Sequence, residues 1–315
     1  NMAELEYFID PHMNTSHDLE AWDGIELRLI PDPEGNKQDV ILSTVSDAVK
    51  KGIIRHETVG WFMIKTFELM SELGIDTELI RFRQHEGDEM AHYATDCWDL
   101  EILGGYGWIE CVGIAYRGCY DLEAHEIAAK SNELKAWREF EENISVEKTI
   151  LAPIQSIIGP IFKDKSKLIT EYLENLDELP ADFPLKIIIE GEEVIIEEKM
   201  VELKNIQTTE RGEWFTPHVI EPAFGIDRIM WHILEHSHDE SLKEGDETYT
   251  VLKLNKKVAP VDFSVYPLYE KDGMKEMAQV IIKSIRLNKG INVNYDGSKS
   301  IGRRYARGDE IGVPY

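Results

Sequence analysis

The sequence predicts an α+β protein with one large domain, a helical and hairpin insertion, and a smaller α/β part at its C-terminal end. Three observations support this. Strand-length apolar runs alternate with helical patterns up to about residue 130 and again over 216–236. The region 131–206 has a pattern of its own, and a strand, a helix and a strand follow one another after residue 256. At roughly 100–200 residues per domain, 315 residues correspond to two domains.

The first elements follow from local patterns. Residues 25–30 (IELRLI) predict a strand, which ends at the turn signal PDPEGN over 31–36. Apolar positions at three- and four-residue spacing over 44–73 predict two helices broken near Gly52. The apolar run GWIECVGIAY over 107–116 has the length of a strand and predicts a buried one.

The middle region is expected to be an insertion. Residues 131–182 are acidic and are interpreted as mainly helical. Residues 185–200 carry two isoleucine-rich runs around Glu190-Gly191-Glu192, which is typical of a β-hairpin.

The last third contains two units. Residues 216–222 predict a strand that turns into a helix over 226–236. A strand over 258–268, a helix over 273–288 and a strand over 291–296 predict a parallel pair in a βαβ unit. Two strands are too few for a stable sheet, so we expect this α/β domain to be truncated.

Composition narrows the class of protein. Hydrophobic residues make up 43% and charged residues 30%, as in globular proteins. No apolar window is long enough for a membrane span, and the first residues are not a signal peptide. The three cysteines form no Cys-x-x-Cys, which favours the reducing cytoplasm. The net charge of −26 argues against nucleic-acid binding unless a local basic site provides it.

Five stretches, in order, resemble segments of class II glycyl-tRNA synthetases of the archaeal and eukaryotic kind. They are NMAELEYF at 1–8, RFRQHEGDEMAHYATDCWD at 81–99, GWIECVGIAYRGCYDL at 107–122, VIEPAFGIDRIM at 219–230 and IGRRYARGDEIGVPY at 301–315. The first resembles the end of motif 2, the fourth resembles motif 3, and the fifth resembles the signature of the class IIa anticodon-binding domain.

The resemblance implies a fold and an activity. It implies a class II core with an antiparallel sheet flanked by helices over 1–256, an insertion at about 131–206, and a partial anticodon-binding domain over 257–315. It also implies ligation of glycine to tRNA(Gly) through a glycyl-adenylate, with ATP and Mg²⁺, in a cytoplasmic homodimer that does not bind membranes. Motif 1, the arginine of motif 2 and the end of the anticodon domain are expected outside this chain, so the chain alone is expected to be inactive.

Four residues are candidates for the ATP site. Arg228 opens a helix after Gly225, where a guanidinium can clamp a phosphate bidentately. By resemblance, Arg228 and Arg117 contact ATP as the catalytic arginines. Glu110 and Glu221 lie in segments predicted to be buried strands, where a carboxylate needs a partner or a metal. By resemblance, both bind ATP and hold Mg²⁺. The alternatives are structural ion pairs, with Asp121 for Arg117, and a surface arginine for Arg228.

The glycine site is expected at Glu4 and residue 223. An enzyme for glycine must neutralise an ammonium group, and a carboxylate is its natural partner. By resemblance, Glu4 binds the amino group. Ala223 occupies the position where the family usually has a serine near the bound glycine, so a hydroxyl is missing. We expect the side chains at 4, 110, 117, 221 and 228 to line a common cavity.

The densest basic cluster is near the end of the chain. Arg303, Arg304 and Arg307 surround Tyr305, a combination that suits phosphate contact and base stacking, so direct binding of tRNA is one interpretation. The other is a folding signature that positions Asp309 and Glu310 through ion pairs.

Three further hypotheses stay open. The chain can belong to a catalytically inactive, synthetase-like accessory or RNA-binding protein, which Ala223 alone favours. It can belong to a synthetase for threonine, serine or proline, although zinc ligands typical of threonine enzymes are not visible. A metal site at His85, His92 and Cys97 is disfavoured, because their spacing matches no common zinc pattern.

Overall fold

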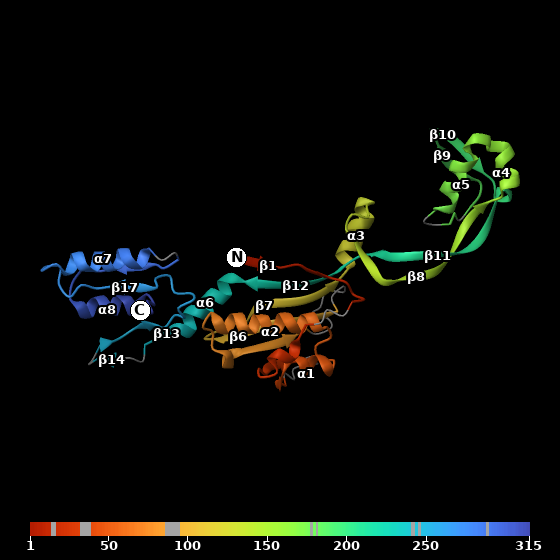
Figure 1. The fold of residues 1–315 in the computed structure, drawn as a ribbon. Coiled ribbons are helices and arrows are strands. Elements are labelled where there is room, and N and C mark those ends of the chain that lie inside the picture. The colour runs from red at the N-terminus through yellow and green to blue at the C-terminus, as the bar shows by residue number, and fades with distance from the viewer. Residues whose placement is uncertain are drawn as a thin grey trace. The chain divides into compact units, whose positions relative to one another are not determined.

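A computed structural model describes residues 1–13, 17–31, 39–85, 95–176, 179–180, 182–240, 243–244, 247–287 and 290–315. The chain divides into two compact units (Figure 1). The first unit comprises residues 1–134 and 216–315, and the second comprises 135–215. Among the described residues, no helix is both long and apolar enough to cross a membrane.

The first unit is built on an eight-stranded sheet. All its neighbouring strands are antiparallel except β3 and β5, which confirms a mainly antiparallel sheet flanked by helices. The strand order is β1 (Met2–Glu4), β12 (His218–Gly225), β7 (Gly107–Gly118), β6 (Asp96–Gly104), β5 (Ile80–Gln84), β3 (Leu27–Ile30) and β4 (Ile41–Ser43), with β2 (Tyr7–Ile9) also on β12.

Alternation in the strands separates a buried face from an open one. In β6, Trp98, Leu100 and Ile102 are fully buried, and the residues between them point to the other side of the sheet. Leu100 pairs with Val112 and Glu101 pairs with Glu110, so β7 has one extra residue, a β-bulge, at this point. The bulge keeps Val112 on the buried face and Glu110 on the open face.

Helices cover the buried face. The helices α2 (Glu57–Glu72) and α6 (Ile226–Ser237) both contact β7 and β12, and α6 also contacts β6. The helix α1 (Val45–Lys50) is capped by Thr44, whose side chain accepts a hydrogen bond from the backbone N–H of Asp47. Short 3₁₀ turns, η1 (Leu19–Trp22) and η2 (Thr77–Leu79), and helix α3 (Tyr120–Ala129) complete this region.

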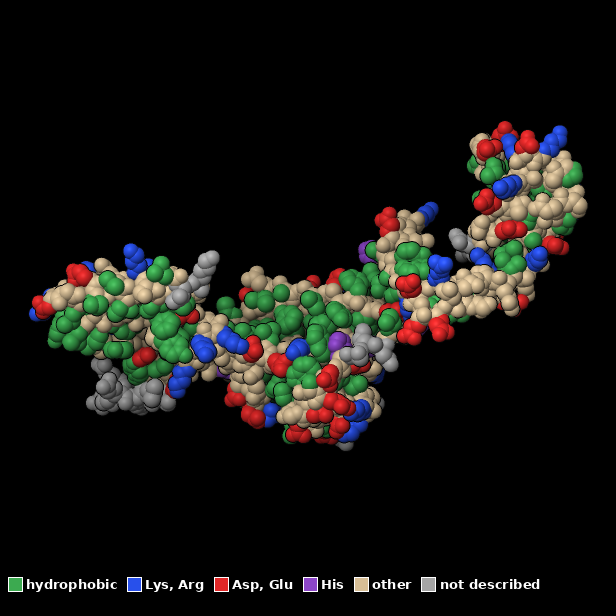
Figure 2. All heavy atoms as spheres, viewed as in Figure 1, with side chains coloured by type: hydrophobic (Ala, Val, Ile, Leu, Met, Phe, Trp, Pro, Cys, Tyr) green, Lys and Arg blue, Asp and Glu red, His purple; other side chains and the backbone are tan. Residues whose placement is uncertain are grey.

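Apolar side chains are exposed at the edge of the sheet. Met2, Leu5 and Phe8 are all at least 47% exposed. Figure 2 shows hydrophobic side chains on the surface over the part of the first unit where β1 and β12 lie.

The end of the chain contains the predicted βαβ unit. The strands β17 (Phe263–Val265) and β18 (Val293–Tyr295) pair in parallel, and α7 (Met274–Arg286) connects them. The last helix is α8 (Ile301–Glu310). Four two-residue strands precede this unit: β13 (His238–Asp239), β14 (Lys243–Glu244), β15 (Glu247–Thr248) and β16 (Val251–Leu252).

The second unit corrects one prediction. The hairpin is confirmed as β9 (Leu185–Ile189) and β10 (Glu192–Ile196), but residues 136–153 are not helical. They form β8 (Ala136–Pro153), which pairs with β11 (Val201–Phe215) along nearly its whole length. Most side chains of β8 are exposed, so no buried face imposes the alternation that marks a strand in sequence.

This unit also has its own core. The helices α4 (Gln155–Phe162) and α5 (Ser166–Glu174) pack with the hairpin around Ile158, Ile169 and Leu173, which are fully buried. The 3₁₀ turns η3 (Lys163–Lys165) and η4 (Glu198–Met200) link these elements.

A buried carboxylate ties three parts of the first unit together. Asp96 is fully buried, and its oxygens accept hydrogen bonds of 2.9 Å from the Gln84 amide, the Trp98 indole and the Arg55 backbone. We expect Asp96→Ala to lower stability by about 3 kcal/mol, because it removes the acceptor of three donors, two of them in buried hydrogen bonds. Thermal unfolding measures the loss. Asp39→Ala, at an exposed position, is the control, and an equal melting temperature for both variants would contradict the prediction.

Candidate active site

Most of the predicted site residues lie on the open face of the central sheet. Cross-strand partners in an antiparallel sheet project to the same side. Ala223 on β12 pairs with Glu4 on β1 and with Gly113 on β7. Gly113 in turn pairs with Asp99 on β6. Four strands therefore contribute one row of side chains in the order Glu4, Ala223, Gly113 and Asp99.

Neighbouring positions lie on the same face. Glu221 pairs with Ala115, and Ala115 pairs with Cys97. Glu110 shares the face of Gly113, because its Oε1 lies 3.9 Å from where a Cβ at residue 113 would be. The centre of the open face thus consists of the small residues Gly113, Ala115 and Ala223, and charged residues surround it.

Each candidate arginine is held by carboxylates or a carbonyl. Arg117 donates to Glu221 Oε2 at 2.7 Å and to Asp121 Oδ2 at 2.6 Å, so the ion pair expected as an alternative is present. Burial by itself lowers the pKa of Arg117, but the contacts with Glu221 and Asp121 outweigh burial and raise this pKa. The guanidinium therefore stays protonated. Arg228 Nη1 donates to the Glu110 backbone carbonyl at 2.7 Å and lies 3.4 Å from Glu110 Oε2.

Four of the five residues line two cavities instead of the single one expected. Glu110 and Arg228, with Ala223, line a cavity of about 270 Å³, and Arg117 and Glu221 line another of about 500 Å³. Glu4 lines neither. The physical reason is the centre of the open face between them: Gly113 has no side chain and Ala115 has only a methyl group, so neither lines a cavity.

The two predicted Mg²⁺ ligands lie at opposite ends of this face. Glu221 pairs with Ala115, five residues along β7 from Glu110, so the two backbones are on the order of 15 Å apart at 3.3 Å per residue. Mg²⁺ binds its oxygen ligands at about 2.1 Å, so one ion cannot take both carboxylates directly. Either residue fits an ion that also takes phosphate oxygens.

Another group of potential metal ligands lies on the open face. Among the described residues, His85, Cys97 and Asp99 place one ligand atom each within 4.8 Å of one another. His85 Nε2 is 2.8 Å from Asp99 Oδ2, and hydrogen bonds with Asp99 and then Cys97 raise the pKa of His85 to about 10. The raised pKa favours the protonated imidazole, so the contact with Asp99 is an ion pair at neutral pH. His92 lies outside the described residues.

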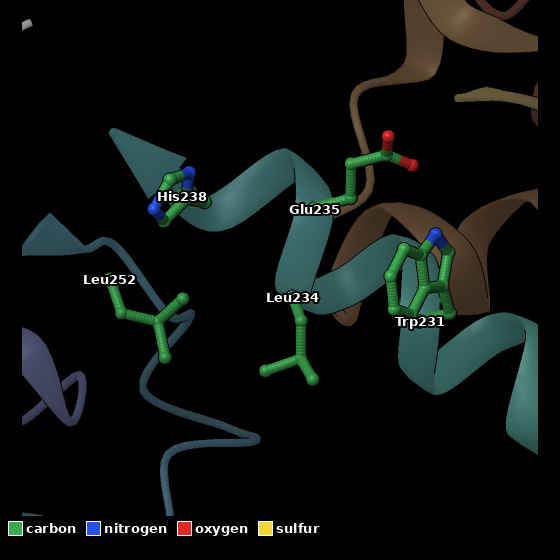
Figure 3. A pocket seen from close by; sticks show the side chains of 5 residues that line it. All are labelled: Trp231, Leu234, Glu235, His238 and Leu252. Carbon is green, nitrogen blue, oxygen red and sulfur yellow. The ribbon is translucent and has the colours of Figure 1, made fainter. Parts of the chain in front are cut away.

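A separate cavity lies beside the far end of α6 (Figure 3). Its volume is about 310 Å³, and its lining consists of Trp231, Leu234, Glu235, His238 and Leu252. Glu235 already accepts a hydrogen bond from the backbone N–H of Gly105 at 2.7 Å. The cavity contains none of the predicted site residues.

Comparisons with known proteins agree with the motifs. Proteins named glycine--tRNA ligase match nearly the whole chain: 41% identity over 318 residues in Methanothrix thermoacetophila, 41% over 332 residues in Methanocaldococcus jannaschii and 39% over 316 residues in Archaeoglobus fulgidus. The matches cover 99–100% of this chain and 54–56% of each relative. The chain belongs to the glycyl-tRNA synthetase family. It spans about half the length of the curated relatives it matches. No model of a known protein family matches it.

The arginine cluster that resembles the family's anticodon-binding signature divides into two kinds. Arg304 is 4% exposed, and its guanidinium donates to the backbone carbonyls of Ser298, Gly297, Lys299 and Pro267. We therefore assign Arg304 to the fold and not to RNA contact.

The other two arginines differ in exposure. Arg307 pairs with Asp296, and hydrogen bonds from Arg307 and then Ser298 lower the pKa of Asp296 to about 2. The folding interpretation thus holds for Arg307, but with Asp296 as partner in place of Asp309 or Glu310. Arg303 is exposed.

Sequence patterns missed two residues of the open face. Asp99 and Gly113 carry no motif role, yet both lie in its central row. Asp99 follows Cys97 by two positions, and this two-residue spacing was the available signal that both side chains share a face.

The arginine assignment can be tested directly. We expect Arg304→Ala to lower the melting temperature strongly, because it leaves four backbone carbonyls without their donor, at about 1 kcal/mol or more for each. Arg303→Ala is the matched control and should leave the melting temperature unchanged. Equal effects of the two variants on thermal unfolding would contradict this division.

The His85–Asp99 pair predicts a pH dependence. The pKa of His85 is about 10 in the folded protein and 6.5 ordinarily, so the pair contributes fully below pH 6.5 and its contribution is lost as the pH rises through about 10. We expect His85→Gln to lower the melting temperature at pH 6 and to have a shrinking effect toward pH 10. A difference that stays constant across this range would contradict the assignment.

Proposed function

We propose that this chain is part of an ATP-dependent glycine–tRNA ligase. In this reaction the glycine carboxylate attacks the α-phosphorus of ATP, pyrophosphate leaves, and glycyl-adenylate forms. A ribose hydroxyl of tRNA(Gly) then attacks the glycyl carbonyl, and AMP leaves. The observation that supports the proposal most is that residues from β1, β7, β12 and α6, in a chain matched end to end by such enzymes, share one open face.

In this proposal the two arginines bind the phosphate groups of ATP. Phosphoryl transfer depends chiefly on positioning and on stabilising charge. Arg228 lies in the first turn of the twelve-residue helix α6, whose N-terminal N–H groups favour an anion. Arg117 lies farther along β7, past Gly113 and Ala115, and lines the other cavity. The two arginines can therefore grip different parts of one nucleotide that lies across Gly113 and Ala115.

In this proposal the carboxylates bind the cations, which are Mg²⁺ and the glycine ammonium group. Glu110 and Glu221 each lie beside a catalytic arginine, where Mg²⁺ could bind one carboxylate together with phosphate oxygens. Mg²⁺ would neutralise phosphate charge as pyrophosphate leaves. Glu4 is proposed to bind the glycine ammonium, and Ala223 beside it contributes a methyl group and no hydrogen bond.

The domain assignments stay proposals. Residues 1–256 would form the catalytic domain with the insertion near 131–206, and 257–315 would belong to an anticodon-binding domain. Support comes from the compact unit at 135–215 and from the βαβ unit at the end of the chain. Binding of tRNA through Arg303, dimerisation and a cytoplasmic location are further parts of the proposal.

Glycine-dependent ATP–pyrophosphate exchange by the complete gene product tests this function. We expect Arg117→Ala and Arg228→Ala each to reduce exchange about 100-fold or more, because each removes a charged donor to the transition state. Arg28→Ala is the control, since Arg28 is on β3, which is separated from β7 and β12 by β5 and β6, and pairs with Glu78. Ala223→Ser reports whether the missing hydroxyl matters.

The alternatives give different results in the same assay. No exchange by the wild-type protein would favour the accessory interpretation. Exchange with another amino acid would contradict the glycine assignment.

A further inference from the structure

The strand β7 contains a second β-bulge, and Arg117 lies in it. Val219 and Ile220 are adjacent on β12. Their partners on β7, Gly118 and Tyr116, are two residues apart, so Arg117 is the extra residue. Gly118 has a φ of 66°, a conformation that favours glycine. A bulge redirects side chains of its strand, so the direction of Arg117 depends on how firmly this bulge is held.

A side-chain hydrogen bond crosses this bulge on the other face of the sheet. The hydroxyl of Tyr116 and Nδ1 of His218 are 2.5 Å apart. The ring of Tyr116 packs against the hydrophobic core, whereas Arg117, the next residue, bonds to Glu221 on the open face. Burial lowers the pKa of His218 and raises the pKa of Tyr116, so both groups are neutral at neutral pH. The contact therefore ties β7 to the first residue of β12 where the backbone pairing is irregular.

The start of helix α2 supports the ring of Tyr116. His56 is the N-cap residue of α2, and its Nδ1 accepts a hydrogen bond of 3.1 Å from the backbone N–H of Thr58. The ring centroids of His56 and Tyr116 are 4.8 Å apart, and those of His218 and Tyr116 are 5.7 Å apart. The Tyr116 ring therefore packs with histidines from two different elements.

We propose that Tyr116 and His218 are positioning residues for Arg117. Their hydrogen bond fixes the β-bulge and thereby directs the guanidinium of Arg117 toward the phosphate groups of ATP. This inference rests on the proposed function, in which Arg117 binds ATP. His218 shares the face of the fully buried Ile220, two residues along β12, so the pair acts on the nucleotide only through Arg117.

The position of a charged donor matters for this reaction. Phosphoryl transfer depends on groups that are in place before the reaction begins. A displacement of about 1 Å can lower the rate on the order of 100-fold. The two carboxylates that bond to Arg117 hold its tip, and the bulge sets the backbone from which the side chain starts.

Three variants separate positioning from folding. Tyr116→Phe keeps the ring and removes the hydroxyl. His218→Ala removes the other partner, and His218→Asn restores a hydrogen-bonding group near the position of Nδ1. Tyr295→Phe is the matched control, because it also removes one tyrosine hydrogen bond, to Glu270, but lies on β18 and outside the central sheet.

The test combines two measurements on the complete gene product, at a temperature at which every variant is folded. They are calorimetric titration with a non-hydrolysable ATP analogue and glycine-dependent ATP–pyrophosphate exchange. Tyr116→Phe and His218→Ala should each weaken analogue binding and lower the kcat of exchange about 10-fold, as expected for one lost hydrogen bond. The KM for glycine should not change. His218→Asn should recover most of the loss, and Tyr295→Phe should match the wild type.

A double-mutant cycle decides whether the pair acts through Arg117. Adding Tyr116→Phe to Arg117→Ala should not weaken analogue binding further, because the group that the pair positions is already gone. A merely structural role would give equal losses with and without Arg117. Equal losses, or unchanged analogue binding by Tyr116→Phe, would overturn the inference.

The proposed function fails by a different result. A wild-type protein that binds the analogue but shows no glycine-dependent exchange overturns the function, and the titrations still decide the positioning. Normal exchange by the wild type and by Tyr116→Phe overturns the positioning alone. A wild-type protein that binds no analogue also overturns the positioning, because Arg117 then has no nucleotide to contact.

Discussion

The register of the central antiparallel sheet is the constraint on which the site depends. Because side chains alternate along each strand, pairing Glu4 with Ala223, Ala223 with Gly113, and Gly113 with Asp99 sends all four to the open face. These residues come from segments up to about 220 positions apart in the chain. A slip of one residue in β7 would turn Gly113 toward the helices and expose Val112 and Ile114, which are now fully buried. The hydrophobic core therefore fixes the chemistry of the opposite face.

The electrostatics of this face reconcile a chain of net charge −26 with anionic substrates. The arginines proposed to bind phosphate are already in contact with acidic residues, Arg117 with Glu221 and Arg228 with Glu110. Such pairing holds each guanidinium in place before the ligand arrives, which lowers the entropy that binding must overcome. Mg²⁺ bound by the same carboxylates would add the positive charge that ATP needs. An acidic site with two positioned arginines therefore suits both an ammonium and a metal-bound triphosphate.

Local patterns were sufficient for elements with one buried face. The helix α2, the strand β7 and the hairpin β9–β10 were all predicted, because burial imposes a period on their sequences. The strand β8 was missed because most of its side chains are exposed and its pairing with β11 is set by distant residues. Motifs indicated Arg117 and Arg228 as candidates, whereas the row through Gly113 and Asp99 follows only from the strand register. Arg304 shows the opposite error, since a basic motif residue is buried and serves the fold.

A crystal structure of the complete gene product with glycine and a non-hydrolysable ATP analogue tests the central claim most directly. The account predicts both ligands on the open face, with the nucleotide phosphates between Arg117 and Arg228 and the glycine ammonium beside Glu4 and Ala223. A nucleotide in the cavity beside Trp231 and Leu234 (Figure 3), with the open face empty, would contradict it.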